Sequence, residues 1–298
     1  MTARQIVNTT YEPFSLEPAY VDANRAFVRN GGMHGRARIL DLACGTGTVS
    51  ELVLECAPDA HLNGVDLDPV QVDLSIERFQ RLGYEVSRST DMTGKRRNGK
   101  PVLHFGVGDA QDLPFESQAF DAVTMANAIH LVDDRDRVLA EIARVLKPGG
   151  LFGFNSTFYG GAMPEGSQRI YLDWIQMAGD YIRKKSEERV ARGEAPITRV
   201  RGTGKGAFKH RWYSIEEWKA ALSGSGFDVR DVNERGLPHD ARCLALIGAY
   251  GGFAEVLLSG YPVAEASEAL QECAAGALAR NGCDSVPRNN LEVWATRV

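Results

Sequence analysis

Short apolar runs alternate with amphipathic segments between residues 38 and 156. Runs of strand length lie at residues 38–43, 62–67, 102–107, 120–125 and 151–155. Segments with helical spacing of apolar side chains lie at residues 49–56, 69–82 and 135–146. Parallel strands joined by crossover helices produce this alternation, so the pattern predicts an α/β core.

The alternation changes after residue 156. A helical stretch over residues 168–192 and a basic loop to residue 211 follow, and we read them as an insertion. The Ser214 to Glu217 capping box then opens a helix to residue 223. A strand over residues 227–234, a helical region to about residue 280 and a final strand over residues 291–297 bring the prediction to seven strands.

These elements predict four regions along the chain. They are an N-terminal helical cover (1–35), a cofactor-binding core (36–156), an inserted cap (157–213) and the end of the core (214–298), which carries a helical insertion (240–285). The long connection between residues 83 and 102 is basic, and we expect an exposed loop or small hairpin there.

Composition narrows the class of protein. The 298 residues are 44% hydrophobic and 24% charged, which suffices for a full core. A net charge of −5 argues against a broad nucleic-acid surface. The five cysteines form no CxxC pair, which favours a reducing, cytoplasmic location over a disulfide framework or zinc site. No apolar run approaches the length of a membrane span, and the N-terminus lacks an apolar signal core.

The strongest chemical signal is Leu40-Asp-Leu-Ala-Cys-Gly-Thr-Gly, at the end of the first strand. Glycines there allow a sharp turn and a close backbone approach to a ligand at a helix N-terminus. Asp66 ends the second strand and can accept hydrogen bonds from ribose hydroxyls. The dinucleotide fingerprint shares these features, but Ser50 stands where its third glycine belongs, so an NAD-dependent oxidoreductase is the weaker alternative.

Ordered motifs make the chain resemble the class I S-adenosylmethionine-dependent methyltransferases, including quinone-type and other small-molecule enzymes. The motifs are Leu40-Asp-Leu-Ala-Cys-Gly-Thr-Gly, Gly64-Val-Asp-Leu-Asp-Pro, Gly108-Asp-Ala-Gln-Asp-Leu-Pro-Phe, Phe120-Asp-Ala-Val and Leu146-Lys-Pro-Gly-Gly. The resemblance implies a Rossmann-like sheet of seven strands, the last antiparallel. It also implies S-adenosyl-L-methionine as cofactor, S-adenosyl-L-homocysteine as product, and a cofactor lying across the carboxyl ends of strands one, two and four.

The resemblance implies a set of cofactor-binding positions. These are Asp41, Ala43, Gly45, Thr46, Gly47, Asp66, Leu67, Asp109, Ala110 and Asn127. Asp66 would hold the ribose, Leu67 and Ala110 would lie along the adenine, and Asp109 would accept from the adenine amine. Ala43, where many relatives have glycine, adds only a methyl group.

His130 is the candidate catalytic residue, because quinone-type methyltransferases often carry histidine at this loop. A neutral imidazole there could take the proton of an acceptor hydroxyl. A histidine that only packs or orients is an equal alternative, since a sulfonium methyl group needs alignment more than a base. The nearby acids Asp133, Asp134 and Asp136 suit the start of a helix, so we expect no metal site.

Aromatic side chains outside the core are candidates for the wall of a substrate pocket. The predicted substrate-binding residues are Tyr11, Phe14, Tyr20, Phe158, Tyr159, Trp212 and His239, with Tyr213 beside them. Five basic side chains between residues 199 and 211 form a local patch, which we read as a solvated loop in preference to an anion site.

The sequence therefore predicts a methyltransferase acting on oxygen or carbon of a small natural-product or quinone-like molecule. The expected partner is that small molecule, with no nucleic acid or membrane involved, and the sequence leaves the oligomeric state open. A protein that binds S-adenosylmethionine without methylating, or that acts as a pericyclase-like catalyst, remains the alternative.

Overall fold

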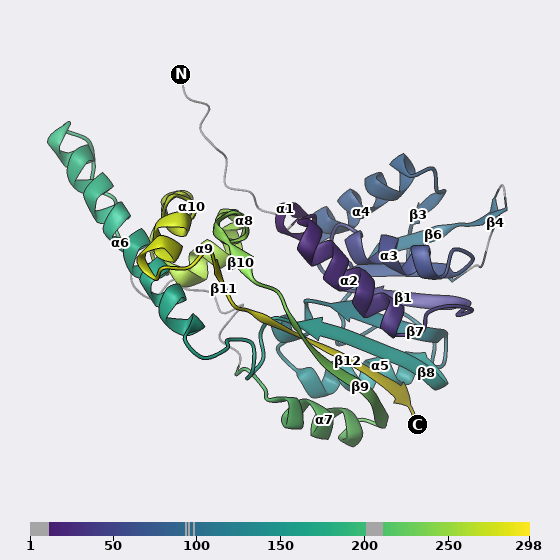
Figure 1. Ribbon diagram of the computed structural model, residues 1–298. Coiled ribbons are helices and arrows are strands. Elements are labelled where there is room, and N and C mark those ends of the chain that lie inside the picture. Colours follow the sequence, from purple (N-terminus) through teal and green to yellow (C-terminus); the bar gives the residue numbers. More distant parts are fainter. Residues whose placement is uncertain (1–11, 93, 95, 98, 201–210) are drawn as a thin grey trace. The chain divides into compact units, whose positions relative to one another are not determined.

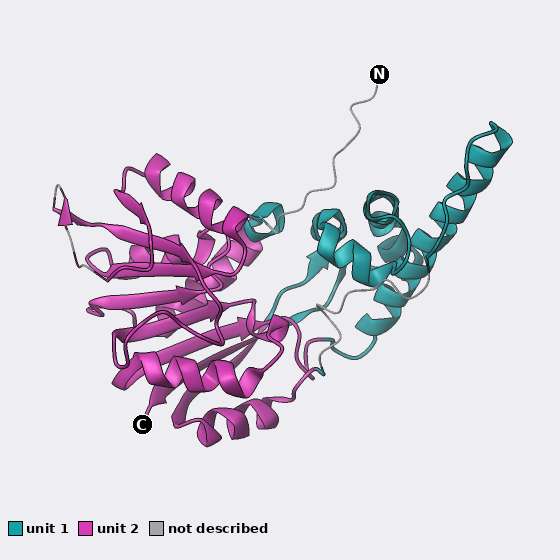
Figure 2. Ribbon diagram, turned by 180° about the vertical axis from the view of Figure 1, so that it is seen from behind, with its two compact units in different colours: residues 1–17, 163–211, 236–289 teal, residues 18–162, 212–235, 290–298 magenta. Residues whose placement is uncertain are grey.

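The computed structural model describes residues 12–92, 94, 96, 97, 99–200 and 211–298. It divides the chain into two units, each built from separate stretches of sequence (Figure 2). Unit 1 contains residues 1–17, 163–211 and 236–289, and unit 2 contains residues 18–162, 212–235 and 290–298. Part of the predicted N-terminal cover, up to Glu17, thus falls in unit 1, and the rest falls in unit 2.

Unit 2 is built on one eight-stranded sheet (Figure 1). In spatial order the strands are β3 (Val86–Arg88), β6 (Leu103–Val107), β2 (His61–Asp66), β1 (Arg38–Leu42), β7 (Phe120–Ala126), β8 (Leu146–Ser156), β12 (Asn289–Arg297) and β9 (Phe227–Gly236). The run from β3 to β8 is parallel, and β12 pairs antiparallel with β8. This confirms the predicted α/β class and its antiparallel last strand.

The sheet has one strand more than predicted. The short β3 pairs with β6 at the sheet edge, inside the connection that we expected to be a loop or hairpin. Only three residues take part, which is too few for a period-two pattern to show. The same connection also holds a small hairpin of β4 (Arg96–Arg97) and β5 (Lys100–Pro101).

Alternate residues of the strands face two separate apolar layers. Ile39, Ala122 and Leu151 face one layer, while their chain neighbours face the other, as strand geometry requires. The first layer lies under α2 (Pro18–Asn30), α3 (Thr48–Cys56) and α4 (Pro69–Arg81). The second lies under α5 (Arg135–Val145), α7 (Ile215–Gly224) and the short helix η1 (Ile129–Leu131). Figure 1 shows the two helical layers on opposite faces of the sheet.

Unit 1 is mostly helical. It contains α1 (Glu12–Ser15), α6 (Ser167–Ala191), α8 (Ala241–Ala249), α9 (Gly251–Leu257), α10 (Val263–Arg280) and the short paired strands β10 (His239–Asp240) and β11 (Ser285–Val286). Its apolar core centres on the fully buried Trp174, whose Nε1 donates to the carbonyl of Leu270 at 2.7 Å.

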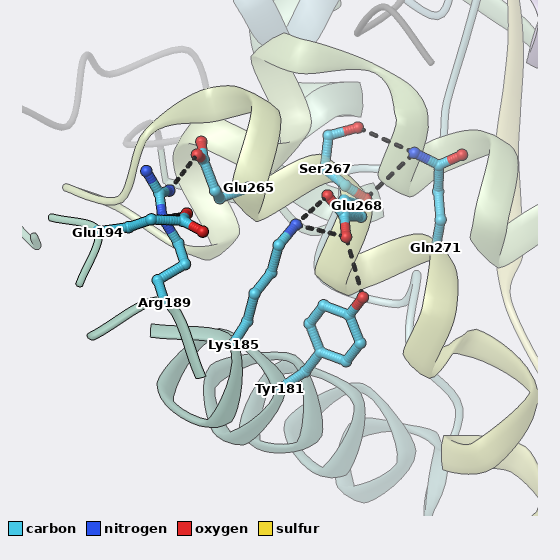
Figure 3. Close-up of polar contacts among 8 residues, drawn as sticks. All are labelled: Tyr181, Lys185, Arg189, Glu194, Glu265, Ser267, Glu268 and Gln271. Carbon is cyan, nitrogen blue, oxygen red and sulfur yellow. Dashed lines mark hydrogen bonds and ion pairs between the residues drawn. The ribbon is translucent and has the colours of Figure 1, made fainter. Parts of the chain in front are cut away.

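Polar contacts join α6 to α10 along one side of this core (Figure 3). The Lys185 ammonium lies 2.6 and 2.5 Å from the two carboxylate oxygens of Glu268, which also accepts from the Tyr181 hydroxyl at 2.9 Å. Arg189 lies 3.5 Å from both Glu194 and Glu265. These are half-exposed pairs that fix how two helices pack, so we assign them a structural role. Within the described residues, no helix is both long enough and apolar enough to cross a bilayer.

Candidate active site

The carboxyl ends of the parallel strands bring together residues that are far apart in sequence. β6, β2, β1 and β7 are neighbours in the sheet and run in the same direction. Ala43 follows β1, Asp66 ends β2, Asp109 follows β6 and Asn127 follows β7. Four predicted cofactor positions therefore lie along one edge of the sheet, where open α/β sheets bind their ligands.

The glycine turn after β1 adopts a left-handed backbone. Ala43 has φ 55°, Gly45 has φ 54° and Gly47 has φ 82°. A Cβ atom on Gly47 would lie 2.9 Å from the ring of Phe79, so this position packs closely against α4. A Cβ on Gly45 would meet nothing within 4 Å, so the turn leaves open space over Gly45. The backbone can thus pass close beneath a ligand at that point.

Asp66 ties the glycine turn to the end of β2. Its Oδ2 accepts the Gly45 N–H at 2.8 Å, and its Oδ1 accepts the Asp68 N–H at 2.9 Å. Burial raises the pKa of Asp66, and these two backbone donors oppose that rise. Each carboxylate oxygen keeps a further lone pair, so Asp66 can still accept from two hydroxyl groups.

Asp41 lies beneath the turn and is almost completely buried. Its carboxylate accepts from the Ser50 hydroxyl at 2.5 Å and from the Thr124 hydroxyl at 2.9 Å. Burial raises the pKa of Asp41 to about 6, although both hydroxyl donors lower it. Sequence reasoning missed Ser50 and Thr124 as partners of this acid, because they come from different elements and follow no recognisable spacing.

Two of the predicted cofactor positions, Leu67 and Asp109, are exposed to solvent. Leu67 is 70% exposed, which leaves a large apolar side chain beside Asp66. Asp109 is exposed and accepts from the backbone N–H of Gln111 at 2.9 Å. Ala110 packs against the apolar layer of unit 2, and Thr46 is buried with its hydroxyl 3.5 Å from that of Thr48. A flat ligand ring could therefore place its apolar face on Leu67 and donate a hydrogen bond from its edge to Asp109.

Asn127 is held by a chain of buried amides. Its backbone, at φ 49°, donates to the Asn155 side-chain oxygen at 2.8 Å. The Asn155 amide donates to the Asn24 oxygen at 2.7 Å, and Asn24 in turn donates to the carbonyl of Tyr20 at 3.0 Å. The chain fastens α2 to the carboxyl ends of β7 and β8, which places the predicted residue Tyr20 in a buried, structural setting.

His130 lies beside two of the aromatic side chains that we predicted for a substrate pocket, Phe158 and Trp212. Its Nδ1 is 3.0 Å from the Ser156 hydroxyl, which accepts the Phe158 N–H at 3.0 Å. The Phe158 ring lies 4.2 Å from the imidazole centroid and 5.7 Å from the Trp212 ring, which meets it edge-on. Three predicted residues therefore form one cluster at the ends of β7 and β8.

Other predicted residues lie elsewhere. Tyr159 is fully buried in unit 2 and its hydroxyl donates to Glu234 of β9, so the structure gives it a packing contact. Phe14 and His239 contact each other inside unit 1, with ring centroids 5.8 Å apart. Tyr11 lies outside the described residues, as does most of the basic loop.

The acids beside His130 act on their own helix. Asp134 caps α5 by accepting the Arg137 N–H at 3.0 Å, and Asp136 pairs with Arg135 at 2.8 Å.

A groove of about 560 Å³ lies on unit 1 and is lined mainly by the C-terminal half of α6. None of its lining residues belongs to the predicted cofactor or substrate sets, and we do not assign the reaction to it.

Comparison with known proteins finds methyltransferases similar to part of this chain. Residues 40–154 match the family model of the methyltransferase domain. The chain is 35% identical to a demethylmenaquinone methyltransferase of Symbiobacterium thermophilum over 130 residues, which cover 43% of this chain and 46% of that protein. The chain thus spans less than half the length of that curated relative.

Solved structures resemble most of the chain in fold. The YcgJ protein of Bacillus subtilis superimposes with a TM-score of 0.55 at 18% identity, covering 93% of this chain and 98% of that one. The 4+2 cyclase SpnF gives a TM-score of 0.53, also at 18% identity, over 93% of this chain and 81% of that one. The resemblance to class I S-adenosylmethionine-dependent methyltransferases is confirmed, and residues 40–154 carry it.

Proposed function

We propose that this protein is an S-adenosylmethionine-dependent methyltransferase that acts on a small organic molecule. The observation that carries the proposal is the shared edge of β1 and β2. There the glycine turn leaves open space over Gly45, and the Asp66 carboxylate accepts from the Gly45 N–H. Such an edge suits a ligand with an amino-acid end and a ribose.

The residues present fit this cofactor. Asp66 has lone pairs for two ribose hydroxyls, and Leu67 offers an exposed apolar face for the adenine ring. Asp109 would accept from the adenine amine, with Ala110 beside it. The N-terminus of α3, which follows the N-cap Gly47, would favour the methionine carboxylate. Asp41, Ala43, Thr46 and Asn127 complete the proposed set.

S-adenosylmethionine, when bound, supplies a methyl group made electrophilic by a sulfonium. The chain's own residues then have to orient the acceptor and exclude water. Alignment of this kind lowers a barrier by up to roughly 7 to 11 kcal/mol in favourable cases. Phe158 and Trp212, which form one cluster with His130, would wall the acceptor side.

His130 is the candidate for handling the acceptor proton. If the Ser156 hydroxyl donates to Nδ1, the proton sits on Nε2 and His130 can only donate a hydrogen bond there. If Nδ1–H donates to Ser156 instead, Nε2 becomes the basic atom. Ser156 can accept twice, from Phe158 and from His130, so the second state is available for general-base action.

The acceptor that we favour is a quinone-like or natural-product molecule methylated at oxygen or carbon. The demethylmenaquinone methyltransferase relative and the aromatic cluster around His130 support this class. We further propose a cytoplasmic location and no nucleic-acid or membrane partner, in line with the mild net acidity of the chain.

Calorimetry tests the cofactor assignment. Titration with S-adenosylhomocysteine should give micromolar binding, and NADH should give none. Asp66→Ala should weaken binding by about 1 to 3 kcal/mol, or about 5- to 150-fold, because polar groups of the ligand lose their partner. Asp59→Ala is the matched control, since its side chain is 86% exposed. Unchanged affinity in the Asp66 variant would refute the assignment.

Methyl transfer from labelled cofactor to a panel of hydroquinones tests the reaction. A general base at His130 predicts that His130→Gln slows turnover by about 10²- to 10⁴-fold and removes the low-pH limb of the rate profile. An orienting role predicts a smaller, pH-independent loss. Cofactor binding without turnover on any acceptor would instead support a non-methylating protein.

A further inference from the structure

His239 of unit 1 has one ring nitrogen in a hydrogen bond and the other without a partner. β10 presents the imidazole, which is 6% exposed and meets the Phe14 ring edge-on. The Tyr171 hydroxyl lies 3.1 Å from Nδ1. Nε2 is buried and, within the described part of the chain, makes no hydrogen bond. Native proteins rarely leave such an atom unpaired, so this one calls for an explanation.

The direction of the hydrogen bonds decides what Nε2 can do. Arg288 is 5% exposed, and its guanidinium carbon lies 5.7 Å from the centroid of the Tyr171 ring, beside the Tyr171 hydroxyl to which it can only donate. Arginine has no acceptor, so the Tyr171 hydroxyl proton must go elsewhere. Nδ1 of His239, 3.1 Å away, is the acceptor that lies next to that hydroxyl. The relay therefore runs from Arg288 through Tyr171 to Nδ1, which leaves the imidazole proton on Nε2.

The charge state agrees with this tautomer. Burial, and next the nearby Arg288 charge, lower the pKa of His239 to about 3, while Asp240 opposes them weakly. The imidazole is therefore neutral at ordinary pH, and Nε2–H is a donor. The buried Arg288 cation behind the relay polarises Tyr171 and His239 toward that donor. A negatively charged oxygen is the acceptor that such a donor favours most.

We propose that the Arg288–Tyr171–His239 relay of unit 1 binds an anionic oxygen, a carboxylate or phenolate, of a small aromatic molecule. His239 donates from Nε2–H to that oxygen, and Phe14 contributes an apolar ring beside it. Tyr171 and Arg288 are positioning residues that act through His239. This inference does not depend on the proposed methyl transfer, because the donor and its relay lie within unit 1.

Nuclear magnetic resonance of the full chain labelled with ¹⁵N-histidine tests the relay. The chain has six histidines, and the signal absent from His239→Phe, or from His239→Gln if that folds better, assigns His239. We expect the Nε2–H tautomer and no titration between about pH 8 and pH 5. Tyr171→Phe should abolish the tautomer preference. An Nδ1–H tautomer in the wild type would overturn the relay.

Benzoate is the probe for the anionic oxygen, and benzyl alcohol is the neutral control of the same size. Benzoate should shift the Nε2–H signal saturably, and benzyl alcohol should bind at least about tenfold more weakly, because charge-assisted hydrogen bonds are stronger. Absence of a saturable shift, as for a site filled by water, would refute the proposal. Calorimetry with S-adenosylhomocysteine reports separately on unit 2, so failure of one assignment is distinguishable from failure of the other.

Discussion

Replacing Asp41 by asparagine should make the protein more stable and its cofactor binding weaker. Asp41 is 1% exposed, and it accepts hydrogen bonds from Ser50 and Thr124. Asparagine has nearly the same shape and removes the charge that burial penalises. The Ser50 and Thr124 hydroxyls can accept as well as donate, so both can still pair with the new amide.

The expected gain follows from the pKa of Asp41. The value is about 6 in the folded chain and 3.8 in the reference state, a rise of about two units or about 3 kcal/mol. Below pH 3.8 both states are protonated and Asp41 contributes nothing. Between 3.8 and about 6 only the folded state keeps the proton, so the free energy of unfolding falls as pH rises. Above that range the full penalty is present.

Urea unfolding at about pH 5 and pH 8 measures this effect. Asp41→Asn should raise the free energy of unfolding by up to about 3 kcal/mol at pH 8 and by less at pH 5. The exposed control Asp59→Asn should change neither value. S-adenosylhomocysteine should bind Asp41→Asn more weakly, because the charge below the turn is lost. A variant that is less stable at pH 8, or that keeps the wild-type pH dependence, would refute the reasoning.

Three further predictions concern stability. The pKa of His239 is about 3 in the folded chain and 6.5 in the reference state, so the free energy of unfolding should fall progressively below pH 6.5. In urea unfolding at about pH 7 and pH 4.5, His239→Gln should lack this contribution to the pH dependence. Glu292→Gln should lower the free energy of unfolding by about 3 kcal/mol, since it leaves Arg235, now 2.5 Å from this buried carboxylate, without its counterion; equal urea midpoints would contradict this. Gly153→Ala should also destabilise by about 1 to 3 kcal/mol, because its Cβ would lie 2.2 Å from the Trp294 ring, and a thermal melt unchanged from wild type would show that the ring can move.

The start of β8 is an element boundary that the local sequence did not predict. The expected fifth strand starts at residue 151, because Pro148-Gly-Gly is a typical helix stop. The structure ends α5 at Val145 and begins β8 at once with Leu146, which pairs with Phe120 across an irregularity in the ladder. Pairing with β7 decided where β8 begins. The sequence of one segment does not show which strand will pair with it.

The sequence by itself determined the α/β class, the position of the glycine turn and the acids that follow the strands. These depend on short-range patterns, because strand and helix periodicity and turn glycines are properties of adjacent residues. The methyltransferase resemblance over residues 40–154 depends on the same local motifs. Ala43, Asp66, Asp109 and Asn127 follow or end neighbouring strands at one edge of the sheet, and the roles of the predicted residues in binding and catalysis stay predictions.

Only the tertiary structure decided which side chains meet. Asn24 and Asn155 are 131 residues apart, and Tyr171 and His239 are 68 apart, yet each pair forms a hydrogen bond. The division into two units also assigned His239 to a different unit from His130, although both were predicted near one site. Hydrogen bonds between distant side chains leave no periodic trace in a sequence, because they depend on how whole elements pack after each has formed.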